Sequence, residues 1–130
     1  LDQAVDVAAA PPALDPRATG TRQAFVGGWL DRVPSARDPW AILQQTPGVA
    51  MDRENIGGNM SGQQSNYLVR GATPSNTKWT LDGLDVTDMT FPGASPTYFD
   101  FEALEEVTVV TGGADVRQQT GGLGVVLVTR

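Results

Sequence analysis

The stretch LVRGATPSNTKWTLDGLDVTD, residues 68–88, decides the fold because short apolar segments alternate there with polar turns. The pair Asp82–Gly83 lies between two such segments, which is typical of a tight β-hairpin turn because both central residues take a positive φ angle. The stretch therefore predicts a small sheet of short strands joined by polar loops. The strands are expected at residues 66–69, 78–81 and 84–86.

Strand directions place the loops of this stretch. If the chain runs upward in the first strand, the polar loop 71–77 lies at the top and the Asp82–Gly83 turn lies at the bottom. The third strand returns the chain to the top, where the polar loop 87–98 follows. Two polar loops therefore share one end, and loops gathered at one end of a rigid scaffold are a usual place for binding.

The clearest helix is expected within residues 35–49. Asp38 can cap its start, and Pro39 suits the first helical position, where a missing N–H costs nothing. Trp40 and Leu43 are three residues apart and can face the core. Further strands are expected at 4–10, 23–26, 49–53, 107–111 and 125–129, with a helical turn at 29–30 and a short helix at 100–107 capped by Asp100. This mixture predicts an α+β fold, with a small mixed β-sheet, short flanking helices and long loops.

Composition limits the function of this chain. Its 130 residues are the size of one domain, and 40% of them are hydrophobic, which is enough for a modest core. The net charge is −6 without a basic stripe, so we expect no nucleic-acid partner. The chain has no cysteine and no histidine, which removes thiolate metal sites and the usual general base. We therefore expect no metal, no cofactor and no enzymatic activity.

Acidic side chains are the remaining candidates for chemistry. The carboxylates of the D-x-x-D-x-x-D row at 82–88 alternate between strand faces, so a turn residue and two surface or capping carboxylates are the favoured interpretation. The glutamates of residues 102–106 are explained by a short helix and its exit rather than by acid–base catalysis. No nucleophilic-serine or phosphate-binding motif is present, and the paired glycines are expected to serve turns. Core packing is expected for the tryptophans at 29, 40 and 79.

Five motifs, in order, resemble the plug domain of TonB-dependent outer-membrane receptors. They are ILQQTPGV at 42–49, LVRG at 68–71, WTLDGLDVTD at 79–88, FEALEEVTVVTGG at 101–113 and GVVLVT at 124–129. The finer pattern, with RDPWAILQQTPGV, SGQQS, ASPTYFDFEALEEV and TGGADV, is similar to the branch that carries a carboxypeptidase-regulatory-like domain before the plug. The resemblance covers residues 15–130 as a plug domain and leaves 1–14 as an upstream linker or edge strand.

The resemblance implies a gating and ligand-contacting domain inside the lumen of a transporter barrel in the outer membrane. The chain is too short to contain that barrel, so we expect a fragment that is soluble in isolation. The implied partners are the C-terminal β-barrel of the same receptor, a small solute, and the TonB–ExbB–ExbD energising complex, reached through an upstream segment. The apical loops that face the solute are implied at 54–65, 71–77 and 87–98, with ligand contacts from Asn55, Asn59, Gln63, Gln64, Ser75, Asn76, Thr90 and Tyr98.

One arginine is singled out by the resemblance. Plug domains of this family often carry two arginines that pair with glutamates of the barrel. Arg70 matches the first of them, whereas Thr111 stands at the second position. Arg70 is therefore expected either to act alone in a plug–barrel ion pair or to be a surface charge. The alternative function is a free-standing periplasmic or extracellular ligand-binding module, which the parent gene would distinguish by lacking several hundred residues of barrel strands after Arg130.

Overall fold

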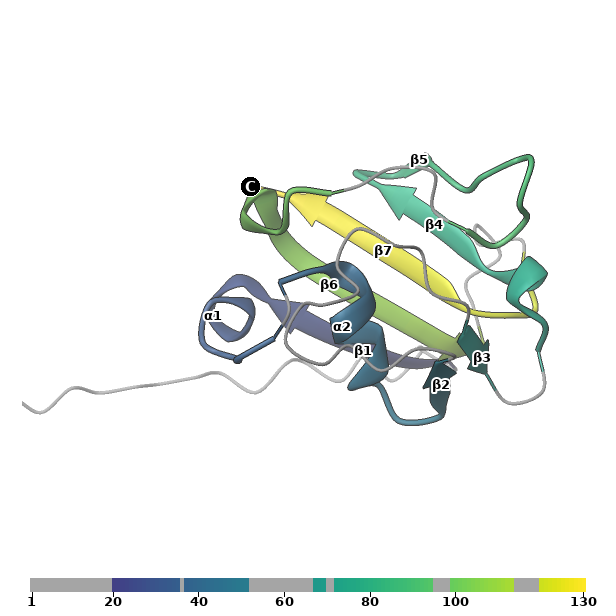
Figure 1. Cartoon of the computed structure of the whole chain (residues 1–130), viewed down its shortest axis with the longest axis horizontal. Coiled ribbons are helices and arrows are strands. Elements are labelled where there is room, and N and C mark those ends of the chain that lie inside the picture. The colour runs from purple at the N-terminus through teal and green to yellow at the C-terminus, as the bar shows by residue number, and fades with distance from the viewer. Residues whose placement is uncertain (1–19, 36, 52–66, 70–71, 95–98, 114–119) are drawn as a thin grey trace, which may run out of the picture.

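A five-stranded mixed sheet, in the strand order β1–β6–β7–β4–β5, forms the frame of the domain (Figure 1). The computed structural model describes residues 20–35, 37–51, 67–69, 72–94, 99–113 and 120–130. The strands of this sheet are β1 (Thr21–Val26), β4 (Lys78–Leu81), β5 (Leu84–Asp85), β6 (Leu104–Gly112) and β7 (Gly124–Thr129).

A smaller sheet and short helical elements complete the fold, which confirms the predicted α+β class. The smaller sheet pairs β2 (Val49–Met51) with β3 (Tyr67–Val69). The helical elements are α1 (Gly27–Leu30), α2 (Pro39–Gln44) and two 3₁₀ turns, η1 (Pro74–Asn76) and η2 (Phe101–Ala103). The strand predicted at 4–10 lies outside the described residues.

The central strands β6 and β7 are antiparallel, and β4 runs parallel to β7 on its other side. Lys78, the first residue of β4, lies beside Gly124, the first residue of β7. The parallel pairing therefore brings the loops that precede β4 and β7 to the same end of the sheet.

One face of the large sheet is buried because apolar residues alternate along its central strands. Val107 and Val109 of β6, and Val125 and Leu127 of β7, are all 0% exposed. Helix α2 and the β2–β3 sheet contribute the other side of this core and lie in front of the large sheet in Figure 1. The opposite face of the sheet carries half-buried residues such as Thr108.

Helix α2 begins as the sequence predicts. The Asp38 carboxylate accepts a hydrogen bond from the Ala41 N–H at 2.7 Å, and Pro39 occupies the first helical position. Trp40 is 4% exposed and Leu43 is 0% exposed, which confirms that both face the core. Neither α2 nor any other helix in the described part of the chain is long and apolar enough to cross a membrane.

The helix predicted at 100–107 is wrong beyond its first turn. The Asp100 carboxylate caps the segment as predicted and accepts a backbone hydrogen bond at 3.1 Å, but only the three residues of η2 are helical. Strand β6 then begins at Leu104, because the chain pairs with β1 on one side and β7 on the other. Hydrogen bonds to two neighbouring strands outweigh the local helix preference of the glutamates that follow.

The hairpin and the strand predicted before it are both confirmed, since β3 covers Tyr67–Val69. Asp82 and Gly83 have φ angles of 48° and 84°, and β4 pairs antiparallel with β5. Strand β3 lies in the second sheet, where it pairs with β2 rather than with β4. The partner of β3 lies earlier in the chain, and local sequence does not identify it.

Candidate functional site

Three loops meet at the end of the sheet where β4 and β7 begin. We call this the loop end and define it by the described residues 72–77, 87–94 and 120–123. The Lys78 N–H donates to the Leu123 carbonyl at 2.8 Å, which joins the first loop to the third. The second loop lies at this end as well, because β5 runs antiparallel to β4. The first and second loops therefore share one end, opposite the Asp82–Gly83 turn, as the sequence predicts.

Gly93 fixes the second loop against the first. Its φ angle is 89°, and a Cβ atom at this position would lie 1.7 Å from the Pro74 carbonyl oxygen. The Gly93 carbonyl oxygen accepts hydrogen bonds from the Tyr67 hydroxyl at 2.7 Å and from Trp79 Nε1 at 3.1 Å. The base of the loop is thus clamped between backbone on one side and buried aromatic side chains on the other.

Those aromatic side chains form the floor below the loops. Trp79 is 0% exposed, and its ring lies 6.0 Å from Tyr67, 6.1 Å from Trp40 and 6.4 Å from Phe99, centroid to centroid. Trp79 Nε1 also donates to the Tyr67 hydroxyl at 2.6 Å. Burial raises the pKa of the Tyr67 phenol, so this hydroxyl stays a neutral donor to Gly93.

The third loop was missed from the sequence, where its paired glycines were expected only to serve a turn. The Thr120 hydroxyl donates to the Asn76 carbonyl oxygen, and the Gly122 N–H donates to Thr120 Oγ1 at 3.1 Å. A Cβ atom on Gly122 would lie 2.4 Å from the Asn76 carbonyl oxygen, so this contact also needs glycine. The loop reaches this end because β4 pairs parallel with β7. A sequence pattern does not specify such a pairing, so the sequence held no signal for this loop.

The loop end brings together three of the predicted contact residues. Ser75, Asn76 and Thr90 are exposed there, and the Thr90 N–H is held by the Asp88 carboxylate at 2.6 Å. The predicted residues that lie outside the described part of the chain are Asn55, Asn59, Gln63, Gln64, Tyr98 and Arg70. The described surface offers hydroxyl and amide groups for hydrogen bonding, without a catalytic arrangement.

The opposite end of the sheet is held by charged groups. We call it the hairpin end and define it by the described residues 31–35, 37, 81–84, 100–104 and 129–130. The Asp82 carboxylate accepts from the Thr129 N–H at 2.9 Å and from the Thr129 hydroxyl at 2.7 Å. These two hydrogen bonds, chiefly the one from the N–H, lower the pKa of Asp82.

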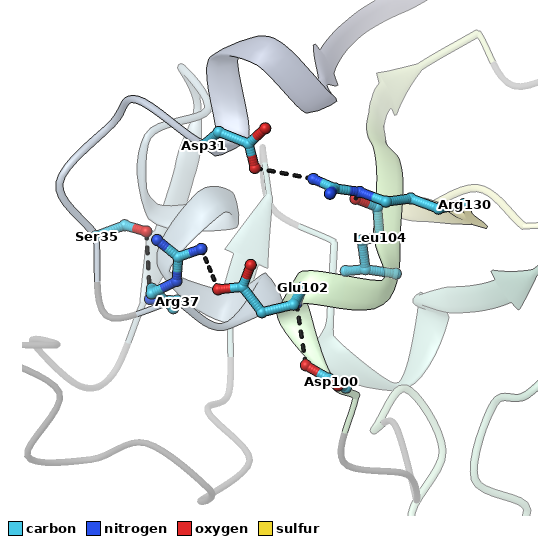
Figure 2. Close-up of polar contacts among 7 residues, drawn as sticks. All are labelled: Asp31, Ser35, Arg37, Asp100, Glu102, Leu104 and Arg130. Carbon is cyan, nitrogen blue, oxygen red and sulfur yellow. Dashed lines mark hydrogen bonds and ion pairs between the residues drawn. The ribbon is translucent and has the colours of Figure 1, made fainter.

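Figure 2 shows two ion pairs at the hairpin end. Arg130 contacts the Asp31 carboxylate at 2.8 Å, and its Nε donates to the Leu104 carbonyl oxygen at 3.3 Å. Arg37 pairs with Glu102, which connects the segment before α2 to η2. Arg130, which follows β7, therefore contacts both the residue after α1 and the first residue of β6.

The row of aspartates forms no metal site. Asp82 binds Thr129, Asp85 pairs with Lys78 at 3.2 Å, and Asp88 caps its own loop. Thr87, with a smaller contribution from Lys78, lowers the pKa of Asp85. In the described ranges, no three carboxylates are close enough to hold a metal ion, and each aspartate has the turn or surface role that the sequence predicts.

Thr111 stands where the resemblance expects a second arginine. It is buried, and its hydroxyl donates to the Thr21 carbonyl oxygen at 3.4 Å. The position therefore links β6 to the edge strand β1 within the domain itself.

Comparison with known proteins decides the family. The family model described as "TonB-dependent Receptor Plug Domain" matches residues 18–126. The chain belongs to this family. No curated protein matches the plug domain at the sequence level.

Solved structures share the fold of this plug domain. The outer-membrane transporter YddB of Escherichia coli has a TM-score of 0.69 at 16% identity, over 84% of this chain and 17% of its own. A mutant of the ferric enterobactin receptor PfeA of Pseudomonas aeruginosa has a TM-score of 0.64 at 21% identity, over 88% and 18%. A mutant of the hemophore receptor HasR of Serratia marcescens, solved with HasA and heme, has a TM-score of 0.59 at 19% identity, over 85% and 17%. The plug domain thus spans less than a fifth of each of these proteins.

Proposed function

We propose that this plug domain closes the barrel of an outer-membrane active transporter and contacts the solute with its loop end. The observation that carries the proposal is the convergence of three loops at one end of the sheet, opposite the end where β7 finishes. Lys78 and Gly124 begin their strands at the loop end, whereas Arg130 is bound at the hairpin end. In this arrangement the loop end faces outward and the hairpin end faces the periplasm.

The proposed partners follow from this arrangement. The C-terminal barrel of the same receptor surrounds the domain, and the TonB–ExbB–ExbD complex acts through a segment upstream of it. The solute is proposed to be small, as ferric enterobactin is for the related receptor PfeA. We place the receptor in the branch with an upstream carboxypeptidase-regulatory-like domain, on motifs such as RDPWAILQQTPGV and TGGADV. The excised domain is expected to be soluble.

The proposed contacts to the solute come from all three predicted apical loops. Ser75, Asn76 and Thr90 are exposed at the loop end, which supports their role. The further proposed contacts are Asn55, Asn59, Gln63, Gln64 and Tyr98. Arg70 is proposed to pair with a glutamate of the barrel, without a second arginine, because Thr111 is engaged within the domain.

Deletion of the plug tests the proposed gating. In the intact receptor, removal of residues 20–130 is expected to leave an open barrel that conducts ions in planar lipid bilayers, whereas the wild-type receptor stays closed. A control receptor with Ser75→Ala keeps the plug and is expected to stay closed. A deletion variant that inserts into the bilayer but conducts no more than the wild type would contradict the proposal.

The free-standing binding module is the less favoured alternative. The family match spans nearly the whole described chain, and the related structures are receptors and transporters that are several times longer. No observation on the loop end favours a separate module.

A further inference from the structure

The charges of the proposed apical loops restrict the solute. Loops 54–65, 71–77 and 87–98 contain no lysine and no arginine, and their charged residues are Glu54 and Asp88. The Asp88 carboxylate already accepts hydrogen bonds from two N–H groups of its own loop, at 2.6 and 3.1 Å. An anionic solute placed on these loops would lose hydration without gaining a cationic partner from them.

The same end exposes two large apolar side chains on a fixed loop. Met89 is 97% exposed and Phe91 is 68% exposed. The Asp88 N–H donates to the Ala94 carbonyl oxygen at 2.9 Å, and the Ala94 N–H donates to the Phe91 carbonyl oxygen at 3.0 Å. The loop is therefore closed by its own hydrogen bonds and anchored at Gly93, so Met89 and Phe91 are held in water rather than folded onto the core.

Apolar and hydrogen-bonding groups lie next to each other on this surface. Thr90 is between Met89 and Phe91 in sequence, and the loop meets Ser75 where Gly93 packs against the first loop. Such a surface matches a solute with an apolar face and a hydrogen-bonding edge. Residues 72–77 and 87–94 contain no basic side chain, and Lys78, where β4 begins, is paired with Asp85 at 3.2 Å. This distinguishes the surface from a site for an anionic metal chelate.

We propose that the solute is uncharged and that its apolar or aromatic face contacts Met89 and Phe91 while its hydrogen-bonding edge meets Ser75 and Thr90. This inference rests on the proposed function, because it takes the loop end as the ligand-facing side. It goes further by naming the chemistry of the solute. Peptide-like and sugar-like solutes both present this chemistry.

Two probes that differ in charge test the proposal on the intact receptor. N-acetyl-tryptophanamide is neutral, and N-acetyl-tryptophan carries a carboxylate on the same skeleton. Saturation-transfer NMR with the wild-type receptor is expected to give a signal for the neutral probe that exceeds that of the anion by at least about threefold. The double variant Met89→Ser with Phe91→Ser is expected to abolish this difference. Leu84→Ser is the matched control, because Leu84 is 71% exposed at the hairpin end, and it is expected to change nothing.

A neutral sugar and an anionic chelate complete the test. Stronger transfer to N-acetyl-tryptophanamide than to maltotriose indicates a peptide-like source, and the reverse indicates a sugar-like source. Equal or stronger binding of the anionic probe, tight binding of ferric enterobactin, or no binding by either neutral probe would overturn the inference. A double variant that binds the neutral probe as the wild type does would also overturn it. So would a double variant that makes the receptor less stable, because Met89 and Phe91 would then contact the barrel. The plug assignment would survive these failures, because the conductance of the deletion variant is measured without solute.

Discussion

The two ends of strand β4 are stabilised by different interactions. At the loop end, Gly93 and Gly122 bring backbone into contact with backbone, and the hydrogen bonds are largely between neutral groups. At the hairpin end, exposed charged side chains such as Arg130 and Asp31 hold the segments together. The loop end is therefore fixed by packing and presents a surface poor in charge, whereas the hairpin end is held by contacts that salt and pH weaken.

The difference bears on how a plug works. A ligand floor benefits from a fixed shape, because ordering a flexible loop on binding lowers affinity. Exposed ion pairs contribute little each, so the hairpin end, which we propose faces the energising complex, is the end that yields more easily. The following substitutions test this contrast, from the largest expected effect to the smallest.

Gly93→Ala is expected to have the largest effect. The new Cβ atom would clash with the Pro74 carbonyl and would also strain a positive φ angle, so we expect a loss of at least about 3 kcal/mol in the free energy of unfolding. Gly83→Ala is the matched control, because Gly83 has a similar φ angle of 84° but open space around it. It is expected to cost about 1 kcal/mol. Equal losses in urea denaturation would contradict the packing account of the loop end.

Tyr67→Phe tests the buried hydrogen bonds beneath Gly93. The change removes one donor to Gly93 and leaves Trp79 Nε1 with the Gly93 carbonyl as its remaining acceptor, at 3.1 Å. A loss of about 1–2 kcal/mol in the free energy of unfolding is expected. Thr73→Ala removes an exposed hydroxyl pair with Ser75 and serves as the control, with a loss below about 0.5 kcal/mol. A Tyr67→Phe variant as stable as the wild type would show that the clamp depends on packing alone.

Asp82→Asn tests the charge at the hairpin turn through pH. The folded-state pKa of Asp82 is lowered, so its charged form stabilises the fold above about pH 4, and this stabilisation is lost as the pH falls through the folded-state pKa. The melting temperature of the variant is expected to lie below that of the wild type near neutral pH, and the two should converge in acid. Thr129→Val keeps the N–H donor and removes the hydroxyl, so it should reduce the effect in part. A difference in melting temperature between variant and wild type that does not change with pH would contradict this role for Asp82.

Asp31→Ala is expected to have the smallest effect. Asp31 and Arg130 are 52% and 44% exposed, so their ion pair contributes less than about 1 kcal/mol. The difference from the wild type should disappear at high salt, because screening removes the same attraction. The measurement is urea denaturation at low and high ionic strength. A large loss that persists in salt would mean that Asp31 is part of the buried structure rather than an exposed clasp.

The elements that could be predicted from the sequence depend on neighbouring residues. The Asp82–Gly83 turn and the capped start of α2 need only a few adjacent positions, and both are confirmed. The alternation of Val107 and Val109 likewise identifies a strand with one face in the core. Each of these features is decided by local backbone preference or by side-chain period.

The features that could not be predicted depend on distant partners. Strand β3 pairs with β2, and residues after Ala103 join β6 instead of continuing a helix, because of neighbours far away in the chain. The ion pair of Arg37 with Glu102 spans 65 positions. At the candidate site, the polar loops could be placed by counting strand directions, but the third loop required the parallel pairing of β4 with β7. The roles of the residues in loop 54–65 and of Arg70 stay predictions.

Cysteine labelling of the intact receptor in whole cells tests the central claim, that the two ends of the domain face opposite sides. The chain contains no cysteine, so a single substitution gives a unique site within it. Ser75→Cys at the loop end is expected to react with a membrane-impermeant maleimide added outside. Leu84→Cys at the hairpin end is expected to react only after the outer membrane is opened, and the receptor without an added cysteine gives the background. Labelling of Leu84→Cys from outside while Ser75→Cys stays protected would contradict the account.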